Sequence, residues 1–358
     1  MKLLPFFCVV FTLLQYLSAA DDEFSKCDPK CVFEERTITS KNIGSFPKCA
    51  KVCAFLLIDD TSGVTEKQLN TAFKNMKTLI GGLEIYDTNY KSASFLAGLQ
   101  RMESATMGIT INGNNEMLEL GWKNLTTLMV YYLDVYGNDK LKKLNLPKWK
   151  TFSCIGATCT TTGIINNYAE PKFCFSINEA KMLSSPKVFL PMISGKICAP
   201  KASNKKVCTK PTAGCQELIG NLNINAKFDV KKVKALKFLY GSLIVKGTNF
   251  TNLNFLGNLT RIVQLSQLKT AVEIQNNKQL KAVKLPKLTR ILTTQWDSLQ
   301  IKNNHKSMMT DSKSCYALRA AMVPDGSWTD MPHFDGLTCE QVENPGKATT
   351  KKASGGIS

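Results

Sequence analysis

The stretch that decides the fold is residues 73–102, FKNMKTLIGGLEIYDTNYKSASFLAGLQRM. Residues 233–262, VKALKFLYGSLIVKGTNFTNLNFLGNLTRI, align with it without a gap and agree at eleven of thirty positions. Shared residues include Leu79/Leu239, Gly81/Gly241, Leu83/Leu243, Thr88/Thr248, Asn89/Asn249, Phe95/Phe255, Leu96/Leu256 and Leu99/Leu259. Chance does not produce such agreement, so the sequence predicts two homologous domains.

A shorter repeat lies inside each copy. Triplets of the form apolar-x-apolar return every 21 to 29 residues. They stand at residues 56–58, 83–85, 109–111 and 133–135, and again at 222–224, 243–245, 272–274 and 299–301. A period of this length predicts a solenoid, in which each coil buries its apolar side against its neighbours.

Polar corners follow the predicted strands. They read Asn114-Asn115, Asn138-Asp139, Asn276-Asn277 and Asn303-Asn304. Asparagine tolerates left-handed backbone, and its amide can satisfy backbone groups at a turn, so stacked coils would align these corners into a ladder. Because Asn249 stands at a corner position equivalent to Asn89, we expect its side chain to point inward.

The N-terminus predicts export. Lys2 and the apolar run 3–17 precede Ser18-Ala19-Ala20, which is the layout of a cleaved signal peptide over residues 1–20. An N-terminal membrane anchor is the alternative. No later run is long enough to span a bilayer, so the mature chain is expected to be secreted, extracellular and without a membrane span. The polar tail 344–358 is expected to be disordered.

Cysteine usage agrees with an oxidising compartment. Cys8 leaves with the signal, and an even number then remains, which predicts disulfides. We expect one of Cys27 or Cys31 to pair with Cys49 or Cys53, and Cys315 to pair with Cys339. Zinc is the competing interpretation, but the spacing is wrong and we expect no metal. The predicted disulfide cysteines are Cys27, Cys31, Cys49, Cys53, Cys154, Cys159, Cys174, Cys198, Cys208, Cys215, Cys315 and Cys339.

The charge balance limits the partners. The net charge is +18, carried mostly by lysine. A basic secreted chain can meet anionic glycans, whereas lysines that only maintain solubility are the simpler interpretation. No nucleic-acid motif is present, and no cofactor is expected. Three N-x-S/T sequons, at Asn124, Asn258 and Asn249, predict glycosylation, and Asn249 is the least suitable of them if it points inward.

Several motifs resemble the receptor L domain of insulin and EGF receptors. Residues 215–224, CQELIGNLNI, resemble its opening, as do 241–245 and 255–262, and Cys49–Ile58 matches less cleanly. The whole chain is similar to the secreted receptor-L-domain proteins of nematodes. The resemblance implies a mainly β chain of two tandem right-handed β-helix-like (leucine-rich-repeat-like) solenoids with short capping helices and disulfides. Ordinary leucine-rich repeats are the alternative.

The resemblance, over about 49–150 and 215–310, also divides the chain. A first receptor L domain with its N-terminal cap occupies 21–153, and a second occupies 208–314. Residues 154–207 form a cysteine-containing connector between them. Residues 315–343 form a C-terminal disulfide cap.

Strand alternation predicts an outer face for the first domain. If the apolar members of each triplet point inward, their neighbours form two columns on the other side. This predicted ligand-binding set is Leu57, Asp59, Glu84, Tyr86, Thr110, Asn112, Asp134 and Tyr136. The set is acidic and carries two tyrosines, on an otherwise basic chain. Rigid aromatic side chains with flanking charge are typical of binding surfaces.

The function implied by the resemblance is recognition of a ligand. We expect a secreted, non-catalytic protein that binds an insulin-like or other growth-factor peptide, or a cell-surface receptor, as a soluble carrier or decoy. The alternative is an extracellular adhesion or matrix protein that binds anionic glycans through its basic surface. Neither His305 nor His333 belongs to a recognisable triad, and nothing places a carboxylate pair such as Asp59-Asp60 in a cleft, so we expect no enzyme.

Overall fold

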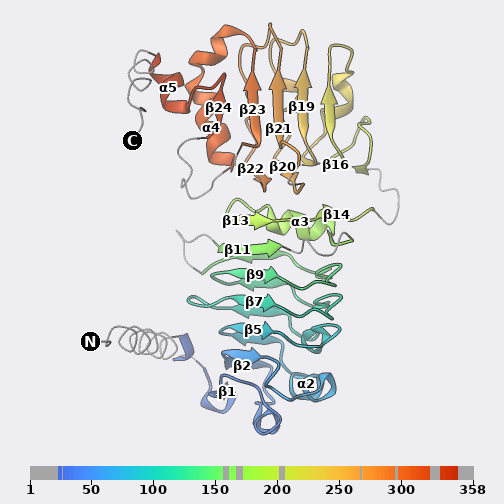
Figure 1. The fold of residues 1–358 in the computed structure, drawn as a ribbon, viewed down its shortest axis with the longest axis vertical. Helices are drawn as coiled ribbons and strands as arrows, with labels where there is room; N and C mark the ends of the chain where they lie inside the picture. The colour runs from blue at the N-terminus through green and yellow to red at the C-terminus, as the bar shows by residue number, and fades with distance from the viewer. Residues whose placement is uncertain are drawn as a thin grey trace, which may run out of the picture. The chain divides into compact units, whose positions relative to one another are not determined.

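A computed structural model gives the fold of two compact units, Met1–Gly195 and Lys196–Ser358 (Figure 1). It describes residues 23–25, 27–155, 161–166, 172–200, 206–266, 268–294, 297–322 and 331–345. The predicted signal peptide, Cys159 and nearly all of the C-terminal tail lie outside these residues.

The first unit is a parallel solenoid with two six-stranded sheets. The sheet that comes first in each coil, here called the leading sheet, has the order β1 (Val32–Phe33), β2 (Lys51–Ala54), β4 (Thr78–Ile80), β6 (Arg101–Glu103), β8 (Thr127–Met129), β10 (Thr151–Ser153). The following sheet has the order β13 (Val188–Ile193), β11 (Thr161–Asn166), β9 (Leu133–Tyr136), β7 (Ile109–Asn112), β5 (Leu83–Tyr86), β3 (Leu56–Ile58). The four predicted triplets of this copy are therefore strands, stacked as expected.

Short helices close the coils of the first unit. Helix α2 (Glu66–Ala72) begins at a capping box of Thr65 and Gln68, and α3 (Ile177–Leu183) begins at one of Ser176 and Glu179. The buried Glu179 carboxylate also accepts a hydrogen bond from the backbone N–H of Leu146 (2.8 Å), which ties α3 to the last full coil. The 3-10 turns η1 (Pro29–Cys31), η2 (Ile43–Ser45) and η3 (Ser94–Leu96) and strand β12 (Cys174–Phe175) complete the unit.

The segment 154–207, expected to be a connector, has a different role in the structure. Strands β11 and β13 continue the following sheet beyond β9, and α3 packs near β10 and β12. Most of its described residues therefore belong to the first solenoid. The physical reason is that β9 would otherwise leave an unpaired edge, which β11 and β13 cover in turn.

The second unit repeats the design with two five-stranded sheets. Its leading sheet has the order β15 (Val207–Cys208), β16 (Glu217–Ile219), β18 (Phe238–Tyr240), β20 (Arg261–Gln264), β22 (Arg290–Thr293). Its following sheet has the order β17 (Leu222–Ile224), β19 (Leu243–Lys246), β21 (Val272–Gln275), β23 (Leu299–Lys302), β24 (His333–Phe334). The remaining elements are β14 (Lys196–Ile197), η4 (Val230–Val233), η5 (Asn254–Leu256), η6 (Lys306–Thr310), α4 (Ser312–Met322) and α5 (Cys339–Glu343).

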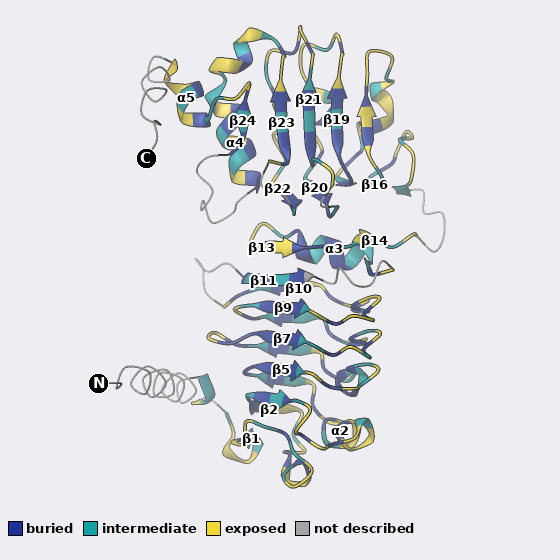
Figure 2. Cartoon of the chain, viewed as in Figure 1, coloured by how far each residue is buried: buried dark blue, intermediate teal, exposed yellow. Residues whose placement is uncertain are grey.

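The core lies between the sheets of each unit, and Figure 2 shows buried residues, in dark blue, along many of the strands. The inward members of the triplets are buried as predicted, for example Leu83, Ile85 and Val135 at 0% exposure. The backbone conformation explains why a glycine recurs at the tight corner between the two sheets. Gly81 has φ +121° and Gly241 has φ +153°, and a Cβ at Gly81 would come within 2.2 Å of the Ala54 carbonyl oxygen.

The asparagine ladder forms as the sequence predicts. The buried Asn114 side chain donates to the Ile85 carbonyl (2.9 Å) and accepts from the backbone N–H of Thr88 (3.0 Å), both in the preceding coil. Its own backbone N–H donates to the Asn138 side chain in the next coil (3.0 Å). In the second unit, Asn277 makes the same bonds to Val245, Thr248 and Asn304. Each buried amide thus joins adjacent coils.

Disulfides close both ends of the chain. Cys27–Cys53 and Cys31–Cys49 link the first cap to β2, and Cys315–Cys339 links α4 to α5, in agreement with the pairings expected. Cys208–Cys215 opens the second unit, and Cys154, Cys174 and Cys198 are also disulfide-bonded.

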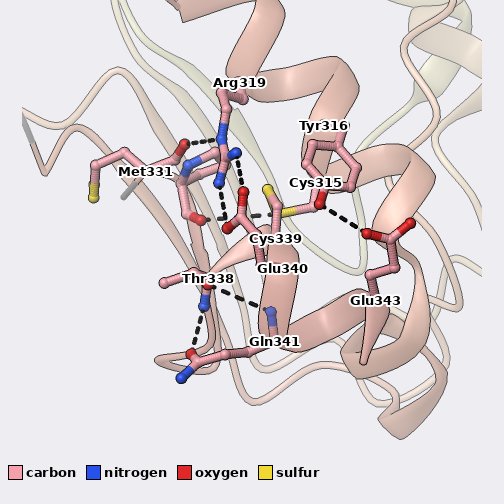
Figure 3. A network of polar contacts seen from close by, with 10 residues as sticks. Cys315, Tyr316, Arg319, Met331, Thr338, Cys339, Glu340, Gln341 and Glu343 are labelled. Atoms are coloured by element: carbon pink, nitrogen blue, oxygen red, sulfur yellow. Dashed lines mark hydrogen bonds and ion pairs between the residues drawn. A yellow bond between two sulfur atoms is a disulfide. The ribbon is translucent and has the colours of Figure 1, made fainter. Parts of the chain in front are cut away.

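A polar network surrounds the Cys315–Cys339 bridge (Figure 3). The Arg319 guanidinium donates to both carboxylate oxygens of Glu340 and to the Met331 carbonyl (2.8 Å). The hydrogen bond from Arg319 holds the pKa of Glu340 at about 2. Tyr316 donates to Glu343 (3.0 Å), so both acidic residues fix α5 against α4.

We predict that Asn114→Ala lowers the free energy of unfolding by about 2–3 kcal/mol, because it leaves buried backbone groups without partners. Urea unfolding followed by circular dichroism measures this. Asn115→Ala is the matched control, since Asn115 is the exposed neighbour in the same corner. Equal midpoints for the two variants would show that the ladder contributes no stability.

We predict that Glu340→Gln destabilises the chain at pH 7 by less than about 1 kcal/mol, because Glu340 is largely solvated. The folded pKa of Glu340 lies below its usual 4.5, so this contribution is present at neutral pH and is lost as the pH falls from 4.5 towards about 2. Thermal unfolding of both proteins between pH 7 and pH 3 tests the sign. A difference that grows on acidification contradicts the ion pair.

Candidate functional site

The predicted ligand-binding residues lie on the outer side of the following sheet of the first unit. The strand register places Leu57, Glu84, Thr110 and Asp134 beside one another in one column. Tyr86, Asn112 and Tyr136 form the second column. Here these seven residues are called the outer face. Thr110 is buried and the other six are half-buried, so none of these side chains is fully exposed to solvent.

Asp59 has a different role from that of the outer face. It follows the end of β3, and its carboxylate accepts hydrogen bonds from the backbone N–H (2.9 Å) and hydroxyl (2.7 Å) of Thr61. Its backbone N–H donates to the Ser62 hydroxyl (3.0 Å). Asp59 therefore stabilises the turn after β3. Strand alternation alone could not reveal this role, because the strand ends one residue earlier.

Arg36 joins the face from outside the repeat. Residues 36–38 run along the edge of β3, where the backbone N–H of Leu57 donates to the Arg36 carbonyl (2.9 Å). This pairing places the Arg36 guanidinium 2.8 Å from the Glu84 carboxylate, and the arginine remains half exposed. Nothing in the local sequence signals this contact, because the two residues stand 48 positions apart. The outer face thus has a cation at one end.

Tyr86 is the centre of the aromatic part. Burial raises the pKa of its hydroxyl, a hydrogen bond with Thr110 opposes that shift, and the nearby Glu84 and Tyr136 raise the pKa further. The phenol therefore stays protonated at neutral pH and keeps a hydroxyl hydrogen to donate. With Tyr136 in the same column, it supplies a rigid, amphipathic contact surface.

Asp134 is the most constrained carboxylate of the face. One oxygen accepts a hydrogen bond from the backbone N–H of Ile164 on β11 (2.7 Å). The close approach of β11 needs Gly163, since a Cβ there would come within 2.0 Å of the Leu133 carbonyl oxygen. Burial raises the pKa of Asp134, and the Ile164 hydrogen bond only partly opposes the shift. Asp134 therefore holds a strand in place as well as carrying charge.

The face continues beyond the predicted residues with apolar side chains. Ile164 on β11 lies beside Asp134 in register, and Met192 on β13 lies beside Ile164. Met192 is 44% exposed. Neither residue is predicted from the sequence, because both fall in the expected connector. The short apolar runs around them, such as Ile164-Ile165, were the available signal.

Several polar groups on the equivalent face of the second unit bond to one another. Lys246 pairs with Glu273 (3.0 Å), and Gln275 donates to Gln300 (3.1 Å). His333 on β24 lies beside Gln300 in register. This face lacks tyrosine, so the first unit is the better candidate for ligand binding. The face comprises Asn223, Ile244, Lys246, Glu273, Gln275, Gln300 and Lys302, extended by His333, whereas Asn225 follows the end of β17 and accepts a hydrogen bond from the backbone N–H of Lys227 (3.0 Å).

The two histidines have separate structural settings. His305 Nδ1 accepts a hydrogen bond from the backbone N–H of Ser307 (3.1 Å) and caps η6. His333 lies in β24. Within the described part of the chain, no group of three or more histidine, cysteine, aspartate or glutamate residues is placed to hold a metal ion.

The sequons differ from expectation in one respect. Asn249 and its equivalent Asn89 are exposed, so the prediction that Asn249 points inward is wrong. The preceding residue of each copy, Thr88 or Thr248, is buried and bonds the asparagine ladder instead. In each copy the residue before the threonine, Asp87 or Gly247, has a positive φ. This left-handed backbone directs the threonine inward and leaves the following asparagine outside.

The other two sequon asparagines bridge coils. The amide nitrogen of Asn124 donates to the Ala97 carbonyl (2.9 Å), and that of Asn258 donates to the Lys234 carbonyl (2.9 Å).

Comparison with known proteins agrees with the duplicated solenoid. A family model described as the receptor L domain matches residues 48–131 and 214–319, which together make up more than half of the chain. Each match contains one copy of the duplicated stretch. No curated protein matches the chain.

We predict that Asp134→Asn stabilises the protein at neutral pH, because the amide oxygen can still accept from Ile164 while no charge is buried. The folded pKa of Asp134 is raised, so the cost of ionising it is absent at low pH and appears as the pH rises past the unfolded value. Thermal unfolding from pH 3 to pH 8 measures the difference. Asp139→Asn is the control at an exposed corner and should not alter the pH dependence. A neutral-pH loss of stability in Asp134→Asn contradicts this account.

Proposed function

Because the chain belongs to the receptor L-domain family, we propose that its first unit binds an extracellular peptide on the outer face. Receptor L domains are ligand-binding domains of receptors, so a binding role is the family's common property. The observation that carries the proposal is the column of two tyrosines beside two carboxylates, on a chain with net charge +18.

The chemistry of the outer face favours a peptide of mixed charge. Glu84 and Asp134 attract basic side chains, whereas Arg36 offers a cation to a peptide carboxylate. Tyr86 and Tyr136 bury area with little loss of side-chain entropy. The columns are fixed by parallel strands, so little ordering is needed on binding.

The apolar extension widens this surface. Ile164 and Met192 lie in register beyond Asp134 and add apolar area next to the charged part. Such an order, from charged and aromatic to apolar, suits an amphipathic ligand such as an insulin-like or other growth-factor peptide.

The proposed role is that of a secreted, non-catalytic carrier or decoy. Disulfides at both ends of the chain fit an extracellular protein. In the parts of the chain that the structure describes, no helix has the length and apolar character needed to cross a bilayer. The receptor L-domain family and the β-solenoid fold are typically non-catalytic.

We predict that Tyr86→Ala with Tyr136→Ala weakens binding of an insulin-like peptide by at least about tenfold, since buried aromatic anchors dominate such interfaces. Biolayer interferometry with the mature chain measures the affinity at low and high salt. Tyr131→Ala is the matched control, because Tyr131 is 51% exposed but lies between β8 and β9, outside both columns. Unaltered affinity in the double variant, or an equal loss in the control, would refute this site.

A further inference from the structure

A second surface of the first unit carries exposed lysines whose positive charges are not neutralised by ion pairs. Its position is the turn at which each coil enters the leading sheet. Here successive coils are joined by backbone hydrogen bonds from Lys77 to Ala50 (2.7 Å), from Gln100 to Lys77 (2.8 Å), from Thr126 to Gln100 (2.8 Å) and from Lys150 to Thr126 (2.8 Å). The exposed lysines at this turn, here called the lysine turn, are Lys48, Lys74, Lys77, Lys148 and Lys150.

The lysines of the lysine turn take part in none of the ion pairs found in the described part of the first unit. The described residues of the first unit include the ion pairs Arg36–Glu84, Arg101–Glu103, Lys140–Glu116 and Lys143–Glu119. None of them includes a lysine of the turn. The Lys148 ammonium instead donates to the neutral Asn124 side chain (2.8 Å). The positive charge of the turn is therefore uncompensated by neighbouring carboxylates.

The second unit contains the same arrangement. Lys234 and Lys237 are the aligned equivalents of Lys74 and Lys77, and both are exposed. Lys287 donates to Asn258 (2.8 Å) as Lys148 donates to Asn124. The two copies agree at only eleven of thirty positions in the duplicated stretch, and two of these are the lysines of the turn. The turn is thus a shared feature of both solenoids.

We propose that the lysine turn of each unit binds a linear sulfated polysaccharide. The coils repeat about every 4.8 Å, so Lys77 and Lys150, three coils apart, stand roughly 14 Å from each other along a rigid line, and Lys48 lies one coil beyond Lys77. Such a line matches an extended polyanion better than a single small anion, which needs a concave nest of donors. Between the lysines, the exposed side chain of Gln100 offers polar groups to sugar hydroxyls. This surface is separate from the outer face and does not depend on peptide binding.

The test compares two charge-matched variants of the full mature chain on immobilised heparin. The protein is produced in a bacterial periplasm, where disulfides form and N-glycans do not mask the turn. The turn variant changes three lysines per unit to glutamine: Lys74, Lys77, Lys148, Lys234, Lys237 and Lys287. The control changes three exposed lysines per unit elsewhere: Lys67, Lys91, Lys142, Lys278, Lys281 and Lys306.

The expected result is that the turn variant binds heparin about tenfold more weakly at physiological salt, while the control stays within about twofold of the native chain. A milder pair, Lys77→Gln with Lys237→Gln, leaves the asparagine contacts intact and should lose about threefold. Equal losses in turn and control variants would overturn the proposal in favour of net charge alone. Failure of the native chain to bind heparin would also overturn the proposal, and so would a preference of the native chain for phosphatidylserine vesicles over heparin.

Discussion

The buried side-chain amide at the corner of each coil is the interaction on which both solenoids depend. The side chains of Asn114 and Asn277 each accept a hydrogen bond from a backbone N–H of the preceding coil and donate one to a carbonyl of that coil. Each asparagine also donates its own backbone N–H to the side-chain oxygen of the next asparagine in the ladder. A corner that turns inward would otherwise bury backbone groups without partners, at a cost comparable to the stability of a whole domain when repeated. The ladder therefore fixes the register of every coil above it.

Because the register between coils is fixed, side chains that recur at one position of each coil line up into continuous surfaces. Because parallel strands pair residue by residue, Tyr86 and Tyr136 are held in one column, and Glu84 and Asp134 in the next. The same stacking places Lys77 and Lys150 along another side of the coil. A single solenoid thus carries an acidic, aromatic side and a basic side. Two chemically different partners could be held without competing for the same residues.

Some residues of the proposed sites also hold the fold. Asp134 binds the backbone of β11, and Asn124 links Ala97 to the Lys148 ammonium. Substituting them would change structure and recognition together. Tyr86, Tyr136 and the turn lysines Lys74 and Lys77 are better positions for separating the two, because their side chains lie outside the core.

The sequence by itself determined the strands, the duplication, the inward triplets and the asparagine ladder, because each follows from a repeated local pattern. It also placed Glu84, Tyr86, Asp134 and Tyr136 together, since strand alternation and stacking leave no other choice. Only the tertiary structure decided that Asp59 serves a turn and that Arg36 reaches Glu84. It also decided that β11 and β13 extend the following sheet of the first unit, and that Thr248, not Asn249, turns inward. These depend on where the chain returns to a sheet edge or leaves a strand, and such long-range contacts have no periodic signal in the sequence.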